Sequence, residues 1–345
     1  MKPANQSSIS SEGVIQPHTK LRQGIFIEKY LDPFRIYLLD EKVSEICINH
    51  AHELWIERAG SHAMEQVISE DITEEHLLRL ARQIAALSGQ SINEEFPLLS
   101  ATLPTGERVQ IVIPPAARFG PALSIRKQVV QNMTLDDYQS MGAFENVAIH
   151  DAPLQKSKDN DLKELLSKGK IREFLSAATR AKKNILISGG TSTGKTTLLN
   201  AILSEIDRAE RIITIEDTPE IRPQHPNHLS LLASKGEQGT AKVTIQDLLE
   251  AALRLRPDRI LLGELRGKEA YTFLRAINTG HPGSLTTVHA DTPFGAIEQI
   301  ALMVMQAGLG LTHDQIKTYI SNIVDIVIQL KRVGGKRIIS EVWYP

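Results

Sequence analysis

The sequence has almost no cysteine, and this absence limits the chemistry that the chain can use. Cys47 is the single cysteine among 345 residues, which excludes an internal disulfide and any zinc site built from several cysteines. One cysteine also suits a reducing compartment, so we expect a cytoplasmic protein. The first twenty residues contain no apolar run behind a basic start, and we therefore expect no export signal.

Long apolar segments and an excess of charge of one sign are also missing. The longest nearly uncharged apolar stretch, residues 301–311, is about half as long as a membrane-spanning helix must be, so any membrane contact should be peripheral. Lysine and arginine total 39 and aspartate and glutamate total 41, so no global positive field exists for a nucleic-acid backbone. A direct and specific nucleic-acid ligand is therefore not expected, and a nucleic-acid motor would bind DNA weakly and with strong salt dependence.

Two domains are expected from the length and the pattern of the chain. Division by about 150 residues per domain gives roughly two. Residues 1–24 are rich in serine and glutamine and suit a mobile tail. Residues 25–131 combine short β-patterned runs with one helix that begins after Thr73, which predicts a smaller α+β domain. Residues 184–345 alternate buried-type strands with helices, which predicts an α/β domain with a parallel-type sheet.

A charged stretch separates the two expected domains. Residues 132–183 are dense in charge, and helical spacing returns only near Leu162. We interpret this stretch as a linker with a charged helix, and a surface helix of the second domain is an equally open interpretation from Leu162 onward. At roughly 3.3 Å per extended residue such a linker spans tens of ångströms, so a first domain could pack on the second domain of a neighbouring copy.

The second expected domain opens with a phosphate-binding loop. The motif G-x-x-x-x-G-K-[ST] is complete, and it has a predicted strand before it and a predicted helix after it. Backbone N–H groups of such a loop surround phosphate oxygens, the lysine supplies a cation and the threonine hydroxyl can bind magnesium. We therefore expect ATP with Mg²⁺ to bind here. The expected nucleotide-binding residues are Gly189, Gly190, Thr191, Ser192, Thr193, Gly194, Lys195, Thr196 and Thr197.

Carboxylates follow two of the later predicted strands. Glu264 ends the buried-type run RILLGE, and ligands of a parallel sheet bind at such strand ends. We interpret Glu264 as the general base that acts on the attacking water, and a solvent-facing glutamate is the alternative. Glu216, Asp217 and Glu220 follow the preceding run within five residues, which favours a cluster on the magnesium side over an ordinary acidic turn.

Two histidines bound the next strand-like segment, TGHPGSLTTVHA. Their spacing, without further cysteines, does not favour zinc. Either His281 or His289 could contact the terminal phosphate or could only hold a subdomain together. For His289 a position facing the phosphate and a structural role are equally open interpretations.

These motifs occur in an order that resembles one superfamily. GGTSTGKTT, TIEDTPE, LRLRPDRILLGELRG and TGHPGSLTTVHA resemble the phosphate loop, acidic box, Walker B motif and histidine box of the secretion ATPases. With LPTGERVQIVIPP and SIRK before them, the likeness extends from about residue 25 to the C-terminus, and it is greatest to the traffic ATPases of type IV secretion, the VirB-eleven family. Type II secretion and type IV pilus motors are the alternative, although many type II members have a four-cysteine insertion that this chain lacks.

The resemblance implies a RecA-like P-loop NTPase domain preceded by the smaller α+β domain. It also implies a homohexameric ring that hydrolyses ATP to power assembly of, or transport through, a bacterial type IV secretion system. The implied partners are other secretion subunits, and the implied location is the cytoplasmic face of the inner membrane. A nucleotide-gated scaffold with negligible turnover is the alternative from a different functional class.

The resemblance also assigns roles to individual residues. The implied catalytic set is Glu264, Lys195, Glu220 and His289. The implied magnesium set, partly through water, is Thr196, Glu216, Asp217 and Glu220. Arg108 and Arg126 match first-domain arginines that reach the nucleotide, whereas Arg254 and Arg266 match arginines that flank Walker B and are candidate arginine fingers. The long charged stretch between the domains departs from the family pattern and leaves open how each first domain pairs with a second domain.

Overall fold

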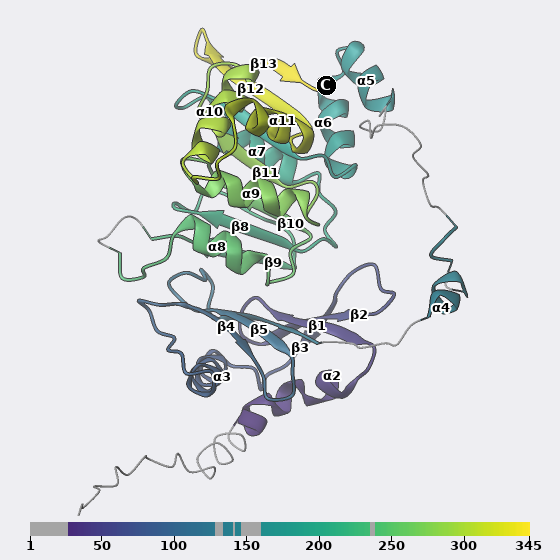
Figure 1. The fold of residues 1–345 in the computed structure, drawn as a ribbon, viewed down its shortest axis with the longest axis vertical. Helices are drawn as coiled ribbons and strands as arrows, with labels where there is room; N and C mark the ends of the chain where they lie inside the picture. The colour runs from purple at the N-terminus through teal and green to yellow at the C-terminus, as the bar shows by residue number, and fades with distance from the viewer. Residues whose placement is uncertain (1–26, 128–133, 141, 146–159, 235–238) are drawn as a thin grey trace, which may run out of the picture.

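The fold is a computed structural model that describes residues 27–127, 134–140, 142–145, 160–234 and 239–345. The expected tail over residues 1–24 and part of the expected linker lie outside the described residues. Figure 1 shows two sheets, one above the other, with the first half of the chain forming the lower one. None of the helices in the described part of the chain combines the length and the apolar character that crossing a bilayer requires.

The first half of the chain forms a six-stranded antiparallel sheet with the order β3-β2-β1-β6-β5-β4. Its strands are β1 (Val43–Ile48), β2 (Glu53–Arg58), β3 (Glu65–Ile68), β4 (Leu98–Thr102), β5 (Arg108–Val112) and β6 (Ala122–Arg126). The helices of this half are η1 (Asp32–Phe34), α2 (Arg35–Leu39) and α3 (Glu74–Leu87). The β-patterned runs of the sequence predicted five of these strands and missed β3, which is an edge strand with largely exposed side chains.

Helix α3 forms where the sequence predicts it. The Thr73 side chain accepts a hydrogen bond from the His76 N–H at 3.1 Å, which satisfies one of the free donors at the helix start. The apolar stripe that includes Leu77, Leu80 and Ile84 is buried in the core beneath the sheet. Gly89 follows the helix with φ +66°, a conformation that glycine adopts without steric cost.

The second half forms a seven-stranded sheet with the order β13-β12-β7-β11-β10-β8-β9. All neighbouring strands are parallel except the hairpin of β12 and β13. The strands are β7 (Ile185–Gly189), β8 (Ile212–Glu216), β9 (His228–Leu232), β10 (Arg259–Leu262), β11 (Leu285–Val288), β12 (Ile326–Val333) and β13 (Lys336–Trp343). The predicted α/β class with a parallel-type sheet, preceded by a smaller α+β region, is confirmed.

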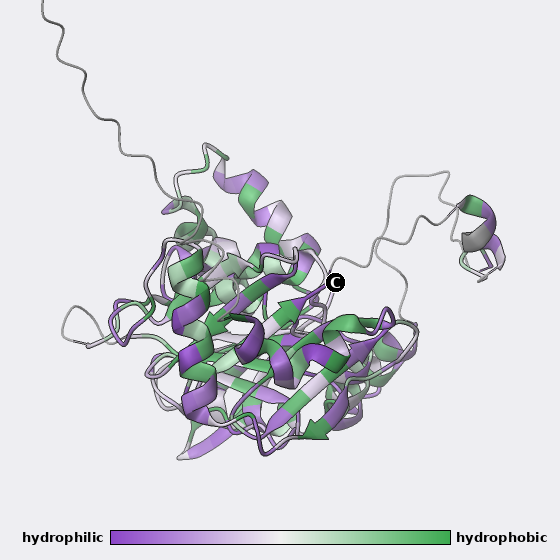
Figure 2. Ribbon diagram, turned by 90° about the horizontal axis from the view of Figure 1, so that it is seen from below, coloured by the Kyte–Doolittle hydropathy of each residue, from purple (hydrophilic) through white to green (hydrophobic). Residues whose placement is uncertain are grey.

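Helices cover both faces of this sheet. They are α5 (Asn160–Ser167), α6 (Ile171–Arg180), α7 (Lys195–Leu203), α8 (Ile245–Ala252), α9 (Glu269–Asn278), α10 (Pro293–Met305) and α11 (His313–Ile323). Helix α4 (Leu135–Ser140) lies apart from the sheet in Figure 1. Alternate strand residues point to opposite faces, so one core forms with α6 and α7 and another with α8 to α11. Figure 2 shows apolar and polar residues alternating along these helices, as such two-sided packing requires.

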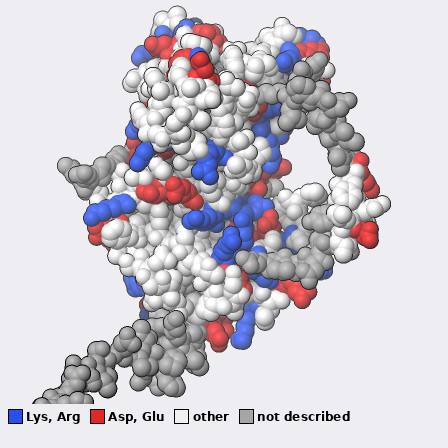
Figure 3. All heavy atoms as spheres, in the orientation of Figure 1, with Lys and Arg blue, Asp and Glu red and all other residues white. Residues whose placement is uncertain are grey.

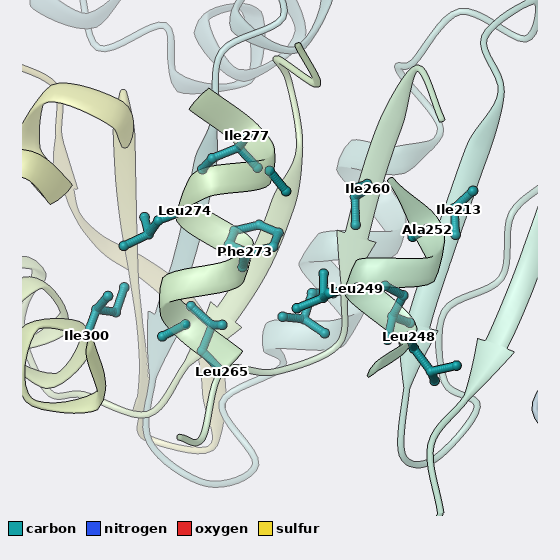
Figure 4. Packing of buried hydrophobic residues seen from close by; sticks show 14 of the residues in the cluster. Ile213, Leu248, Leu249, Ala252, Ile260, Leu265, Phe273, Leu274, Ile277 and Ile300 are labelled. Carbon is teal, nitrogen blue, oxygen red and sulfur yellow. The ribbon is translucent and has the colours of Figure 1, made fainter. Parts of the chain in front are cut away.

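The core on the α8 to α11 side is built from side chains of neighbouring helices. Figure 4 shows Leu249 of α8 lying between its own helix and α9, with Phe273 of α9 close by. Ile213 and Ile260 belong to the same cluster and come from the strands behind the helices. Strands β8 and β10 are parallel neighbours, so the loops that follow them start side by side, and both loops contribute to the site described below.

The two sheets meet along the edge strand β9. Ala117, in the loop after β5, forms an antiparallel bridge with Leu231. The Leu232 N–H donates to the Ala116 carbonyl at 2.8 Å, and the Arg118 N–H donates to the Ser230 carbonyl at 3.0 Å. Strand β9 was not predicted, because its five residues form too short a pattern and because the other half of the chain contributes its outer partner.

Candidate active site

The phosphate loop connects β7 to α7, and its glycines are required by close contacts. A Cβ atom on Gly189 would lie 2.5 Å from the Thr193 hydroxyl and 3.0 Å from the Leu330 carbonyl oxygen, so no larger residue fits there. Gly194 has φ +93° and directly precedes α7. The loop thus wraps closely around the N-terminal end of α7, where free N–H groups favour an anion.

Lys195 extends from the first turn of α7 back over the loop. Its Nζ donates hydrogen bonds to the carbonyl oxygens of Gly189 at 2.9 Å and Gly190 at 3.2 Å. A ring nitrogen of His289 lies 3.3 Å from the same Nζ. Burial lowers the pKa of Lys195, and the charge of Glu264 opposes this shift. Among the described residues no carboxylate forms an ion pair with this ammonium group, and a bound phosphate would supply an anionic partner in direct contact.

Glu264 follows β10 and lies between the side chains of His289 and Arg266. Its Oε1 is 3.2 Å from Nε2 of His289, and its Oε2 accepts a hydrogen bond from Nη2 of Arg266 at 3.0 Å. Arg266 also donates to Asp217 at 2.5 Å, and the hydrogen bond to Glu264 is the main cause of its raised pKa. Arg266 thereby connects the carboxylate after β10 to the acidic segment after β8.

The acidic segment has two kinds of carboxylate. Glu216 is 3% exposed, and its Oε1 accepts N–H groups of Glu220 and Ile221, both at 2.8 Å. Burial raises the pKa of Glu216, although these two hydrogen bonds oppose the rise. Glu220 is exposed at the rim of the site. Glu216 therefore fixes the backbone of the acidic segment, whereas the carboxylates of Asp217 and Glu220 line the cavity.

These elements enclose one cavity of about 400 Å³. The phosphate-loop residues from Thr191 to Thr197 line it on one side, and residues after three neighbouring strands line the other. The remaining lining residues are Glu216, Asp217, Thr218, Glu220, Gly263, Glu264, Arg266, Thr287, His289 and Arg337. All predicted catalytic residues and all predicted magnesium residues thus lie around the same cavity.

The donors at this cavity fit magnesium held together with a nucleotide. Among the described residues, no group of three His, Cys, Asp or Glu side chains could hold a metal ion by itself. Mg²⁺ usually binds through one or two protein oxygens together with phosphates and several waters. Thr196 lines the cavity beside the acidic segment, so its hydroxyl and nearby carboxylates suit that arrangement.

Three predicted arginines and one histidine lie away from this cavity. Arg126 pairs with Glu45 at 2.9 Å and is opposite Arg108 in the first sheet. Arg254 donates to the Ser100 hydroxyl at 3.0 Å, and the His281 ring lies 3.0 Å from the Pro257 carbonyl oxygen. Arg254 precedes β10 and His281 precedes β11, so both lie at the end of the sheet opposite the phosphate loop. In one copy of the chain, none of the four lines the cavity.

Arg337 lines the cavity although the sequence analysis did not select it. It lies on β13, at the far end of the chain from the phosphate loop. Its local sequence, KRVGGKR, indicates only a charged hairpin. The pairing of β12 with β7 brings the hairpin beside the loop, and this pairing could not be read from the sequence.

Charge on the molecular surface is mixed. Figure 3 shows lysine and arginine side chains next to aspartate and glutamate side chains on both halves of the face that it draws. The cavity has the same character, because Lys195, Arg266 and Arg337 line it together with Asp217 and Glu264. Such a site suits a ligand that has both phosphates and a bound cation.

Fold and site together define a RecA-like P-loop nucleotide-binding protein. A family model described as "Type II/IV secretion system protein" matches residues 29–338, and the chain belongs to that family. The predicted membership among the type IV secretion traffic ATPases is confirmed by the relatives that follow.

The relatives are VirB11 proteins of type IV secretion systems. The chain is 41% identical over 328 residues to VirB11 of Bartonella henselae, covering 91% of each chain. It is 38% identical to VirB11 of Brucella suis biovar 1, covering 97% of this chain and 94% of the relative. Among solved structures, the VirB11 ATPase of the Brucella suis type IV secretion system in complex with sulphate superposes with a TM-score of 0.87 at 37% identity, covering 95% and 96% of the two chains.

Proposed function

We propose that this protein is a P-loop ATPase that hydrolyses ATP with Mg²⁺ and powers assembly of, or transport through, a type IV secretion system. The observation that supports it most is the meeting of Lys195, Glu264 and His289 around one cavity beside the phosphate loop. A cation for the phosphates and a carboxylate for the attacking water are the two groups that hydrolysis requires. VirB11 relatives over most of the chain support the secretion context.

Each side chain has a defined task in this proposal. Lys195 binds the β- and γ-phosphates, and the Thr196 hydroxyl holds Mg²⁺ with Asp217 and Glu220 acting through water. The magnesium ion neutralises charge on the phosphates when it is bound. Glu264 orients the water, and His289, 3.2 Å from that carboxylate, positions it and contacts the terminal phosphate. Glu216 keeps the acidic segment in shape through its hydrogen bonds to backbone N–H groups.

In this proposal, the first half of each chain contacts the nucleotide that is bound by another copy of the chain. Arg108 and Arg126 lie away from the cavity of their own chain, so a contact with phosphate requires a neighbouring subunit. The same argument applies to Arg254, whereas Arg266 acts within its own site. We propose a homohexamer in which residues 25–131 and 184–345 are separate folding units joined by residues 132–183, of which α5 and α6 pack on the second unit. Other secretion subunits at the cytoplasmic face of the inner membrane are its proposed partners.

Two variants separate nucleotide binding from hydrolysis. Lys195→Ala should lose both, because it removes the cation that meets the phosphates. Glu264→Gln should still bind ATP but release phosphate about 10²- to 10⁴-fold more slowly, the usual contribution of a positioned acid–base group. Phosphate release and ATP binding are measured on the same preparations. Near-normal turnover by Glu264→Gln removes Glu264 from the role, and negligible turnover by the unmodified protein favours a nucleotide-gated scaffold.

The hexamer is tested separately by sedimentation. We expect a concentration-dependent shift to a six-subunit species in the presence of ATP and magnesium. A protein that stays monomeric at high concentration under these conditions contradicts the ring. Crosslinking in a mixed assembly of tagged variants then shows whether Arg126 lies beside the phosphate loop of its own chain or of another.

A further inference from the structure

The hairpin of β12 and β13 extends beyond the sheet toward the phosphate loop. Leu330 of β12 is paired with Gly189, the last residue of β7, and β12 continues to Val333 past that point. The returning strand β13 brings Arg337 to the position opposite Arg332. Because β12 and β7 are parallel neighbours, this part of the hairpin lies beside the loop that follows β7.

Arg337 contacts the loop through its aliphatic stem. A Cβ atom on Gly194 would lie 3.0 Å from Cδ and 3.7 Å from Nε of Arg337. The stem therefore occupies the space directly over Gly194, the residue before α7, and Arg337 lines the 400 Å³ cavity. Gly194 leaves room for this approach, which is a second reason for glycine at that position besides its φ of +93°.

The Arg337 guanidinium is available to a ligand. Among the described residues no carboxylate forms an ion pair with it, whereas Lys331 on the same hairpin pairs with Glu341 at 3.1 Å. Arg337 is exposed and its neighbour across the hairpin, Arg332, is also a cation. A guanidinium that lies over a phosphate loop without an acidic partner has the charge and geometry to bind an anionic ligand.

The position of Arg337 indicates which end of the nucleotide it meets. His289 and Glu264 follow β11 and β10, which lie on one side of β7, whereas β12 and β13 lie on the other side. If the terminal phosphate lies near Glu264, the rest of the nucleotide extends past the start of α7 toward the hairpin. Given the nucleotide binding proposed above, we infer that Arg337 binds the nucleotide at its α-phosphate, the phosphate next to the ribose.

This inference predicts equal losses for two nucleotides. Arg337→Met keeps an aliphatic stem over Gly194 but removes the charge and the donors. We expect the dissociation constants of ATP and ADP to rise by the same factor, about tenfold, because both nucleotides share the contacted end. Isothermal titration of the full chain with each nucleotide and magnesium measures both constants.

Arg332→Met is the matched control. It removes one charge of the same sign from the same hairpin, but Arg332 does not line the cavity. We expect it to bind both nucleotides within about twofold of the unmodified protein, since an exposed charge at a distance is largely screened.

Three results would overturn the inference. They are unchanged binding by Arg337→Met, an equal loss in Arg332→Met, and a loss confined to ATP, which would place the contact at the terminal phosphate. Failure of the unmodified protein to bind either nucleotide would instead overturn the proposed function. The two failures are therefore distinguishable in the same set of titrations.

Discussion

Arginines lie at both ends of the parallel strands of the seven-stranded sheet. We call the side where these strands begin the first edge and the side where they end the second edge, and the arginines have different roles at the two. At the edge where the parallel strands begin, Arg259 is 1% exposed, and its Nε and Nη2 donate to the two carboxylate oxygens of Glu210 at 2.8 and 2.7 Å. At the edge where the strands end, Arg266 is 59% exposed and connects Asp217 to Glu264 beside a cavity. Residue type is the same at both edges, but burial and available space differ.

This comparison shows which arginines belong to the fold and which to the site. Arg211, also at the first edge, is fully buried and donates to Asn49 from the first half of the chain at 2.6 Å. Arg256 pairs there with Glu57, again across the two halves. A buried cation must keep its partners, because leaving it or its partner uncompensated is costly. A half-exposed arginine can change partners when a nucleotide arrives, so only the second edge suits binding.

The largest expected effect is a loss of protein stability when an arginine of the first edge is replaced. Arg259→Met leaves the partly buried Glu210 without its main partner, so we expect the free energy of unfolding to fall by about 3 kcal/mol. The fall lies at the low end of the usual range because Lys182 remains 3.1 Å from the same carboxylate. Urea denaturation measures it, and Arg266→Met is the control.

For Arg266→Met we expect a change within about 1 kcal/mol, as for exposed ion pairs generally. Equal stability losses in the two variants would contradict the division into a structural edge and a binding edge. A large loss in Arg266→Met alone would reverse it.

A second prediction concerns pH at the contact between Arg256 and Glu57. Burial alone would raise the pKa of Glu57, but the hydrogen bond and charge of Arg256 outweigh burial and lower it. A lowered carboxylate pKa adds stability above the ordinary value of 4.5, and this stability is lost as the pH falls through the folded-state value.

We therefore expect the unmodified protein to be more stable than Arg256→Met at pH 7, and the difference to shrink below about pH 4.5. Thermal unfolding of both proteins from pH 7 to pH 4 measures this. A difference that stays constant to the lowest pH would mean that Arg256 contributes packing rather than charge.

The smallest expected effect lies at the binding edge itself. The pKa of Glu216 is raised by burial, so its ionised form is disfavoured in the folded protein at pH 7. Glu216→Gln removes this penalty and keeps an oxygen for the N–H groups of Glu220 and Ile221. We expect the melting temperature of the nucleotide-free protein to rise by a few degrees at pH 7.

The gain should disappear at pH values where Glu216 is protonated, because both side chains are then neutral. A variant that melts lower than the unmodified protein at pH 7 would show that the carboxylate charge stabilises the acidic segment. Differential scanning calorimetry at pH 7 and pH 4 distinguishes these outcomes.

Local patterns in the sequence predicted most of the elements and the phosphate loop. Thr73 predicted a helix start, and the structure shows its side chain accepting a backbone N–H group there. The loop from Gly189 to Thr196 was predicted because its turn, its cation and its helix start are adjacent in the chain. Interactions between neighbouring residues can be read in this way, since they depend on the chain over only a few positions.

What the sequence determined by itself was the class of protein, the phosphate loop and the carboxylates that follow strands. Tertiary structure alone decided that Arg337 reaches Gly194 and that Arg126 faces Glu45 instead of the cavity of its own chain. It also decided that β9 meets the loop after β5. The physical reason is that strand order and the packing of the two sheets depend on burial summed over the whole chain, whereas a motif depends only on the residues within it.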